Sequence, residues 1–122
     1  MIEVRFTDID SQGHANHLAI AAWISHARVK LLDDAMLWAK MGSRWDHVMV
    51  HISIDFKATI TYPNTVMIFP EIAKIGRKSV TTNYKVCVKG DDAASATCIN
   101  VFMCDDKPTR MPESLKDILC DM

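Results

Sequence analysis

The stretch between residues 7 and 17 gathers side chains that could carry out chemistry within a turn-rich segment. It contains a carboxylate at Asp10, a glycine at Gly13 and imidazoles at His14 and His17. A positioned carboxylate can attack a carbonyl carbon directly or deprotonate an attacking water. Because the loop with Gly13 leads into a helix start, its backbone amides and the helix dipole could stabilise an oxyanion. These features are compatible with hydrolysis, with Asp10 as nucleophile or general base.

The same residues allow other interpretations. Aspartate often accepts bonds from the backbone amides that follow it, so Asp10 could simply organise a turn. His14 and His17 could ligate a metal with Asp10 or His51, but two histidines three apart without a third ligand at defined spacing are a weak signal. We therefore predict no metal and no other cofactor. His14 is expected to orient the loop through a hydrogen bond, and His17 to lie in the first turn of the helix.

The helix that should position this loop is predicted from residue 17 to about residue 40, a stretch without Pro or Gly. Asn16 precedes it as an N-cap candidate, because its side-chain oxygen can accept a bond from a first-turn amide. Leu18 and other apolar flanking residues widen the apolar face, so the helix is expected to be wrapped by a sheet. The apolar residues at helical spacing are Ile20, Ile24, Ala27, Leu31, Ala35 and Trp38.

The strands are predicted at residues 2–6, 50–61, 65–75, 79–89 and 94–104. In the second of these, alternation places six residues on one buried face: Val50, Ile52, Ile54, Phe56, Ala58 and Ile60. Residues 112–119 could add one or two helical turns. One strand, a long helix and four consecutive antiparallel strands predict an α+β domain in which a strongly twisted sheet curls around the helix. The length of 122 residues fits a single domain, residues 1–122.

The composition argues against several classes of protein. A hydrophobic fraction of 49% with 24% charged residues is ordinary for a globular domain. The net charge of −1 gives no electrostatic footprint for nucleic acid or for a membrane surface. The four cysteines show no Cys-x-x-Cys spacing, and no signal peptide or long apolar span precedes them. A reduced, cytoplasmic setting is therefore expected.

The loop carries an Asp-x-Asp-x-x-Gly-His-x-Asn motif from Asp8 to Asn16, and the helix after it contains an Ala27-Arg28 pair. With these features the chain resembles the hotdog thioesterases of the 4-hydroxybenzoyl-CoA thioesterase group, and the resemblance covers most of its length. Three further segments fall where that family has similar residues: Ile54-Asp55-Phe56, Tyr62-Pro63 and Ile75-Gly76-Arg77-Lys78-Ser79.

The resemblance implies a hotdog fold of about five strands around one helix, assembled as a homodimer or dimer of dimers. It implies hydrolysis of an acyl-CoA or acyl-carrier-protein thioester near the subunit boundary, with Asp10 as the catalytic carboxylate; Asp8 carries no such role. Gly13, His14 and Asn16 complete the catalytic loop by the same analogy. The resemblance also implies a set of residues that bind the coenzyme A substrate: His17, Tyr62, Gly76, Arg77, Lys78 and Ser79.

Two points about the basic residues stay open. Arg77 and Lys78 are candidate phosphate contacts by the resemblance. They could also form a solvated turn in which Gly76 supplies the positive φ angle of a tight hairpin. Arg28, midway along the helix, is expected to pair with a carboxylate such as Asp8 or Asp55.

The chain also departs from its relatives. Ser25-His26 stands where many relatives have an acidic residue before the Ala-Arg pair, and Asn64-Thr65 replaces the usual Gly-Asp after the Tyr-Pro turn. These changes affect the acyl pocket more than the fold or Asp10. Two alternative functions remain: a non-catalytic acyl-thioester-binding module, and a hotdog hydratase or dehydratase in which Asp10 and His14 form an acid–base pair.

Overall fold

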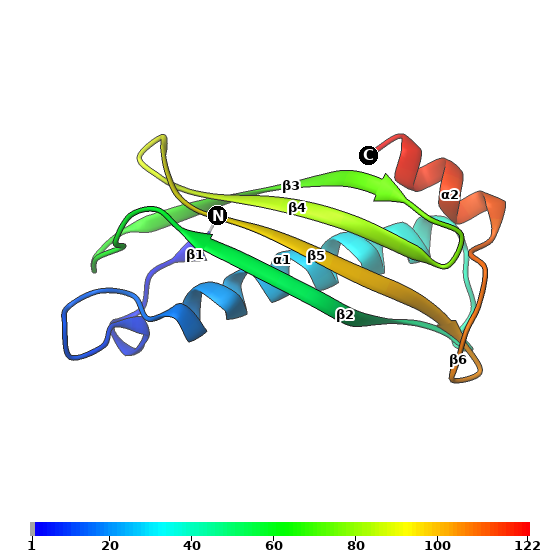
Figure 1. Cartoon of the computed structure of the whole chain (residues 1–122), viewed down its shortest axis with the longest axis horizontal. Coiled ribbons are helices and arrows are strands. Elements are labelled where there is room, and N and C mark those ends of the chain that lie inside the picture. Colours follow the sequence, from blue (N-terminus) through cyan, green and yellow to red (C-terminus); the bar gives the residue numbers. More distant parts are fainter. Residues whose placement is uncertain (1) are drawn as a thin grey trace.

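The computed structural model describes residues 2–122 and shows a curved antiparallel sheet with a long helix along one face (Figure 1). The helices are α1 (His17–Trp38) and α2 (Glu113–Cys120). The sheet order is β1-β3-β4-β5-β2, and β6 pairs with the end of β5. This arrangement confirms the predicted hotdog fold. The strands are β1 (Ile2–Glu3), β2 (Trp45–Phe56), β3 (Thr65–Ile75), β4 (Ser79–Val88), β5 (Asp91–Cys104) and β6 (Lys107–Pro108).

Helix α1 confirms the predicted helix and its cap. The side-chain oxygen of Asn16 accepts a hydrogen bond from the Ala19 amide at 2.8 Å. The apolar face is narrower than predicted, because Leu18 is 69% exposed and Trp38 is 58% exposed. No helix within residues 2–122 is apolar over a length that could cross a membrane. The buried stripe of α1 includes Ile20, Ile24, Arg28, Leu32 and Ala35.

Strand β2 differs from the prediction in its bounds, and three residues of the predicted buried face, Val50, Phe56 and Ala58, are exposed. It begins at Trp45 and ends at Phe56, whose side chain is half-exposed. A β-bulge between Met49 and His51 shifts the register, so Val50 is 59% exposed. Ile52 and Ile54 beyond the bulge still pack against the core, as predicted. Beyond the bulge the alternation of inward and outward residues begins again. The apolar pattern of the sequence runs through Val50 without interruption, so it did not indicate the bulge.

Two hydrophobic clusters hold α1 against the sheet. Ile24, in the first half of the helix, packs with Tyr84 and Val86 of β4 and with the alanines of β5. Leu32, in the second half, packs with Phe102 and with the apolar face of α2. Helix α2 therefore closes the core at the end of the sheet where β3 turns into β4, and the loop before α1 lies at the opposite end (Figure 1).

Replacing Leu32 by alanine should destabilise the fold by about 2–5 kcal/mol, because the fully buried side chain would leave a cavity between α1 and α2. Leu37 provides a matched control on the same helix, since it is 72% exposed. Leu37→Ala should change the free energy of unfolding by less than about 0.5 kcal/mol. Urea unfolding followed by circular dichroism measures both. Equal losses in the two variants would contradict this placement of the helix.

Candidate active site

The loop before α1 is a closed reverse turn that presents Asp10. Ile9 and Ala15 form an isolated β-bridge, and the Asp10 amide donates to the His14 carbonyl at 3.0 Å. The Gly13 amide in turn donates to the Asp10 carbonyl at 3.0 Å. Gly13 has a φ of +81°, in the left-handed region that favours glycine. The backbone of this turn therefore needs a glycine at position 13.

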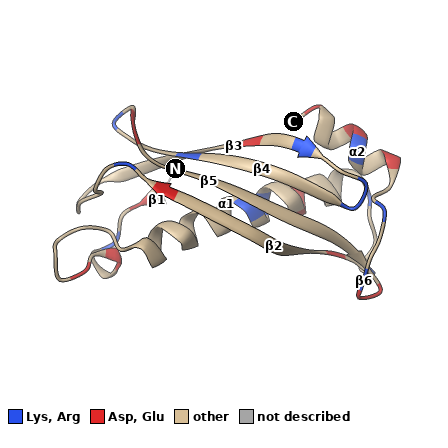
Figure 2. Cartoon of the chain, in the orientation of Figure 1, with Lys and Arg blue, Asp and Glu red and all other residues tan. Residues whose placement is uncertain are grey.

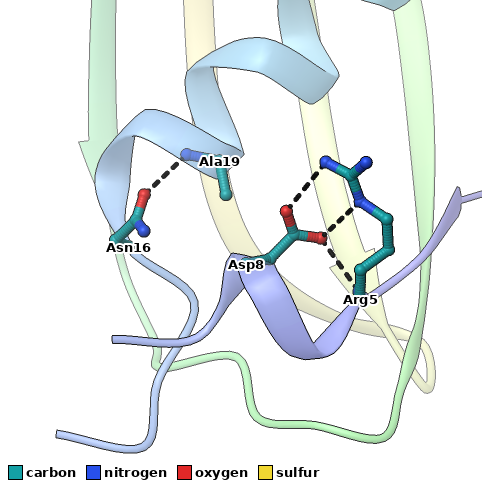
Figure 3. Close-up of polar contacts among 4 residues, drawn as sticks. All are labelled: Arg5, Asp8, Asn16 and Ala19. Atoms are coloured by element: carbon teal, nitrogen blue, oxygen red, sulfur yellow. Dashed lines mark hydrogen bonds and ion pairs between the residues drawn. The ribbon is translucent and has the colours of Figure 1, made fainter. Parts of the chain in front are cut away.

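Two backbone hydrogen bonds attach the turn to the rest of the domain. The Ala15 amide donates to the Ile60 carbonyl at 2.6 Å, and the Asn16 amide donates to the Asp8 carbonyl at 3.0 Å. Asn16 also caps α1, so the end of the turn and the start of the helix are fixed together (Figure 3). The position of Asp10 thus depends on segments on both sides of the loop.

Asp8 is a buried carboxylate that stabilises the segment leading into the loop (Figure 3). It accepts hydrogen bonds from the Arg5 amide at 2.9 Å and from the Arg5 guanidinium at 3.2 Å. These bonds fold Phe6–Asp8 into a 3-10 turn, so the predicted strand over residues 2–6 is limited to Ile2–Glu3. Burial raises the pKa of Asp8, but the hydrogen bonds and charge of Arg5 outweigh it, and the net pKa is lowered.

The carboxylate of Asp10 is exposed and has one oxygen engaged. Its Oδ1 accepts a hydrogen bond from the Gln12 amide at 2.9 Å, which is the turn-organising bond expected of aspartate. Its Oδ2 makes no hydrogen bond within residues 2–122. Asp10 therefore organises the turn with one oxygen and keeps the other available for chemistry.

A cavity of about 220 Å³ lies between this loop, the first turn of α1 and the chain that follows β2. Four of the predicted site residues line it together: Asp10, His14, Asn16 and His17. The rest of its wall is largely apolar and includes Ile20, Phe56, Ala58 and Ile60. A carboxylate, a helix start and an apolar wall thus meet in one cavity.

His14 and Gly13 act differently from the prediction. Within residues 2–122 the His14 side chain makes no hydrogen bond, and its carbonyl orients the loop instead. The Gly13 amide is occupied by Asp10, so it is not a free oxyanion donor in this structure. In the first turn of α1 the Ala19 and Ile20 amides are bound by Asn16, which leaves those of His17 and Leu18 as available donors.

No three His, Cys, Asp or Glu side chains within residues 2–122 are placed to hold a metal ion. His51 lies on β2 with an exposed side chain and does not line the cavity that contains His14 and His17. The cysteines of the chain are free, and Cys87 and Cys98 are buried in β4 and β5.

Tyr62 lies outside the Asp10 cavity. Its ring contacts Phe6 edge to face, with ring centroids 5.9 Å apart, and both rings are at least half-exposed. The two residues line a neighbouring hollow with Pro63 and Asn64. The structure therefore places Tyr62 close to the loop segment but in a different surface depression.

The hairpin residues Gly76, Arg77, Lys78 and Ser79 lie at the other end of the domain. The eleven residues of β3 separate them from the Asp10 end. At a rise of about 3.3 Å per residue, the length of this strand puts the two ends about 35 Å apart. Gly76 does not have a positive φ angle, so that part of the prediction is wrong. A Cβ at Gly76 would lie 2.8 Å from Ser79 Oγ, so a larger residue would require the Ser79 side chain to rotate away.

A cavity of about 180 Å³ beside this hairpin is lined by three cations and by the acidic Glu113, and Figure 2 shows both basic and acidic residues at that end. Arg77 lines it together with Arg110 and Lys116, which the sequence interpretation missed. The Met111 amide donates to the Arg77 carbonyl at 3.0 Å and holds the two segments together. Arg110 and Arg77 are far apart in the sequence, so only the tertiary fold could reveal this cluster.

The fold and site together are those of a hotdog protein with a carboxylate loop at the start of its helix. The chain matches the family described as the thioesterase-like superfamily over residues 4–119, and it belongs to that superfamily. This result confirms the resemblance and the enzyme class, a thioesterase, that the loop motif predicted. No curated protein matches the chain at a significant level.

Solved structures share the fold across nearly the whole chain. A thioesterase from Thermus thermophilus, complexed with coenzyme A and Zn, has a TM-score of 0.85 at 21% identity, covering 98% of this chain and 89% of its own. A DHNA-CoA thioesterase from Staphylococcus aureus has a TM-score of 0.80 at 19% identity, with coverages of 98% and 88%. A 1,4-dihydroxy-2-naphthoyl-CoA thioesterase from Synechocystis has a TM-score of 0.81 at 16% identity, with coverages of 99% and 93%. At these identities the likeness concerns the fold alone.

Replacing Asp8 by asparagine should remove a pH-dependent part of the stability. The folded pKa of Asp8 lies below its ordinary value, so its contribution is present above that value and is lost as the pH falls through the folded pKa. We expect Asp8→Asn to cost about 1 kcal/mol at pH 7, since Arg5 is largely exposed and the pair is partly screened. Urea titrations from pH 7 to pH 3 measure the difference, which should shrink in acid.

The exposed Asp117 in α2 serves as the control for this pH series. Asp117→Asn should leave the free energy of unfolding nearly unchanged at every pH. An Asp8→Asn difference that stays constant from pH 7 to pH 3 would show that the carboxylate charge does not stabilise the turn.

Proposed function

We propose that the protein hydrolyses acyl-CoA thioesters to the free carboxylic acid and coenzyme A, with Asp10 as the catalytic carboxylate. The observation that carries this proposal is the cavity in which the Asp10 carboxylate, the start of α1 and an apolar wall meet. Membership of the thioesterase-like superfamily supports the same reaction. The apolar wall suits an acyl group, and the helix start suits an oxyanion.

In the proposed mechanism the thioester carbonyl oxygen faces the His17 and Leu18 amides at the positive end of the α1 dipole. The free oxygen of Asp10 either attacks the carbonyl carbon or removes a proton from a water that attacks it. The tetrahedral intermediate then collapses and the C–S bond breaks, which releases the thiolate. After direct attack, water cleaves the acyl-Asp10 anhydride and regenerates the carboxylate.

The cationic cavity at the β3–β4 hairpin supports coenzyme A, rather than a carrier protein, as the thiol carrier. Arg77, Arg110 and Lys116 line a small concave site, and none of them forms an ion pair within residues 2–122. Glu113 also lines the site, so its net charge is about +2. This excess of cations around one hollow matches the phosphate groups of a nucleotide, which accept charge-assisted hydrogen bonds. In the proposed complex Lys78 and Ser79 contribute at the rim of this site.

The separation of about 35 Å between the two cavities favours a homodimer in the proposed enzyme. Strand β2 is an edge of the sheet, and its Val48 and Val50 side chains are 46% and 59% exposed. Two copies paired antiparallel along β2 would bring the Asp10 end of one protomer to the hairpin end of its partner. Such a pair, alone or as a dimer of dimers, would join a catalytic loop and a phosphate site from different subunits.

Replacing Asp10 by asparagine should lower kcat by about 10²–10⁴-fold, because the amide retains the turn-organising bond but supplies no base or nucleophile. Thiol release from short, long and aromatic acyl-CoAs measures the rate. Asp55→Asn, an exposed carboxylate on β2, should retain wild-type turnover. Undiminished turnover in Asp10→Asn would exclude Asp10. Tight acyl-CoA binding without turnover by the wild-type protein would favour the non-catalytic binding module instead.

Removing the hairpin cations should weaken recognition of coenzyme A without affecting the reacting end of the substrate. Arg77→Ala and Arg110→Ala are each expected to raise KM for an acyl-CoA by about 5–10-fold, because each removes one partly exposed charge-assisted hydrogen bond to a phosphate. KM for the acyl-N-acetylcysteamine thioester, which has no nucleotide, should stay unchanged. Lys85→Ala on the outer face of β4 is the control. Equal effects on both substrates would contradict a nucleotide site.

A further inference from the structure

The inner end of the Asp10 cavity is closed by the hydrophobic core. Ile20 of α1 and Ile60 of the segment after β2 line the cavity, and they are 4% and 1% exposed. Both belong to the core cluster that includes Ile24, which is fully buried and does not line the cavity. Protein cores are close-packed, so a ligand cannot pass these side chains without displacing them. Ile20 and Ile60 therefore form the floor of the cavity.

The buried stripe of α1 beyond Ile24 offers no continuation for an acyl tail. The next buried residue of the helix is Arg28, whose Nε is buried without a hydrogen-bond partner. No ion pair within residues 2–122 includes Arg28, so the expected pairing with Asp8 or Asp55 is not found. An alkyl tail beside this guanidinium would take away more of its polar surroundings, which costs free energy. The core behind the floor is thus unsuited to a longer tail.

The rest of the apolar wall is open to solvent. Phe56 and Ala58 line the cavity, and both are exposed. The cavity shares no lining residue with the neighbouring hollow of Phe6 and Tyr62. A tail that turned toward the open side would leave its additional carbons in water, where they gain no free energy from burial. A partner subunit along β2 would lie beside Phe56, which ends that strand, and would not alter the floor.

The volume of the cavity limits how many atoms it can hold. An apolar cavity of about 150 Å³ in a protein core can bind one benzene molecule, which has six carbons. At the same density, the 220 Å³ of the Asp10 cavity take about nine non-hydrogen atoms. The carbonyl carbon, the carbonyl oxygen and the sulfur of a thioester account for three of these. About six remain for the acyl tail beyond the carbonyl carbon.

We propose that the acyl group of the substrate is short, with at most about six carbons beyond the carbonyl carbon, and that Ile20 and Ile60 set this limit. The inference rests on the proposed hydrolysis at Asp10, which places the thioester carbonyl between Asp10 and the start of α1. Butanoyl and hexanoyl thioesters fit the cavity, whereas dodecanoyl and palmitoyl thioesters exceed it. Each methylene that enters an apolar cavity strengthens binding about fourfold, so kcat/KM rises with length until the tail reaches the floor.

A series of saturated acyl-CoAs from acetyl to palmitoyl tests this limit. Wild-type kcat/KM should rise about fourfold per methylene up to hexanoyl-CoA and should fall about tenfold or more between hexanoyl-CoA and dodecanoyl-CoA. Ile20→Ala and Ile60→Ala deepen the cavity, so each should move the optimum to chains about two carbons longer. Ala58→Val narrows the cavity and should move the optimum to shorter chains. Ile72→Ala, which removes the same atoms from the core beside α2, should leave the optimum unchanged.

Two outcomes of this series would overturn the proposal while leaving hydrolysis at Asp10 intact. The first is a wild-type kcat/KM that keeps rising to palmitoyl-CoA. The second is an optimum that stays in place in both Ile20→Ala and Ile60→Ala. If Ile20→Ala does not fold by circular dichroism, Ile20→Val, which removes one methyl group, should extend the limit by about one carbon.

Binding of S-alkyl-CoA thioethers provides a second readout that needs no turnover. These molecules keep the alkyl chain and the carrier but have no carbonyl group to hydrolyse. Their Kd, measured by isothermal titration calorimetry, should fall about fourfold per methylene up to S-hexyl-CoA and should not fall further to S-dodecyl-CoA. If the wild type hydrolyses no thioester, the hydrolysis proposal fails, and a Kd that keeps falling to S-dodecyl-CoA would separately overturn the length limit. Absence of binding by every thioether would overturn both.

Discussion

Packing of one helix into one curved sheet fixes where every functional group lies in this protein. Ile24 and Leu32, two turns apart on α1, are both fully buried against the sheet and set the depth and direction of the helix. Because α1 runs along the sheet, its first turn must open at one end and its last turn must meet α2 at the other (Figure 1). The carboxylate loop and the cationic hairpin are consequently kept at opposite ends of a single rigid layer.

The loop that presents Asp10 depends on polar contacts rather than on apolar burial. Arg5 and Asp8 order the segment before the turn, and Asn16 orders the segment after it. Both contacts use a side chain to satisfy backbone amides that would otherwise lack partners. The result is a short turn whose geometry is set from both sides, so that only one oxygen of Asp10 bonds the turn and the other stays free.

Local signals in the sequence were sufficient for the features that have local causes. Helix α1, the Asn16 cap and the order of the elements follow from periodicity and from one N-cap residue, and the loop motif located the turn that carries Asp10. The features that the sequence did not reveal arise from contacts between distant segments. The Val50 bulge depends on pairing with β5, the Arg110 contribution depends on the fold bringing it beside Arg77, and the missing partner of Arg28 depends on what surrounds it. Gly76 shows the same limit, since its φ angle is not positive and its near neighbour is the Ser79 side chain from the other side of the hairpin.

The exposure of the basic residues at the hairpin limits what they can contribute to the proposed enzyme. Arg77 and Arg110 are exposed, so dissolved salt screens their charges and each contributes modestly to attraction of an anion. Glu113 lines the same cavity and reduces its net positive charge. Exposed cations can therefore gather a phosphate-bearing carrier from solution without discriminating among acyl groups.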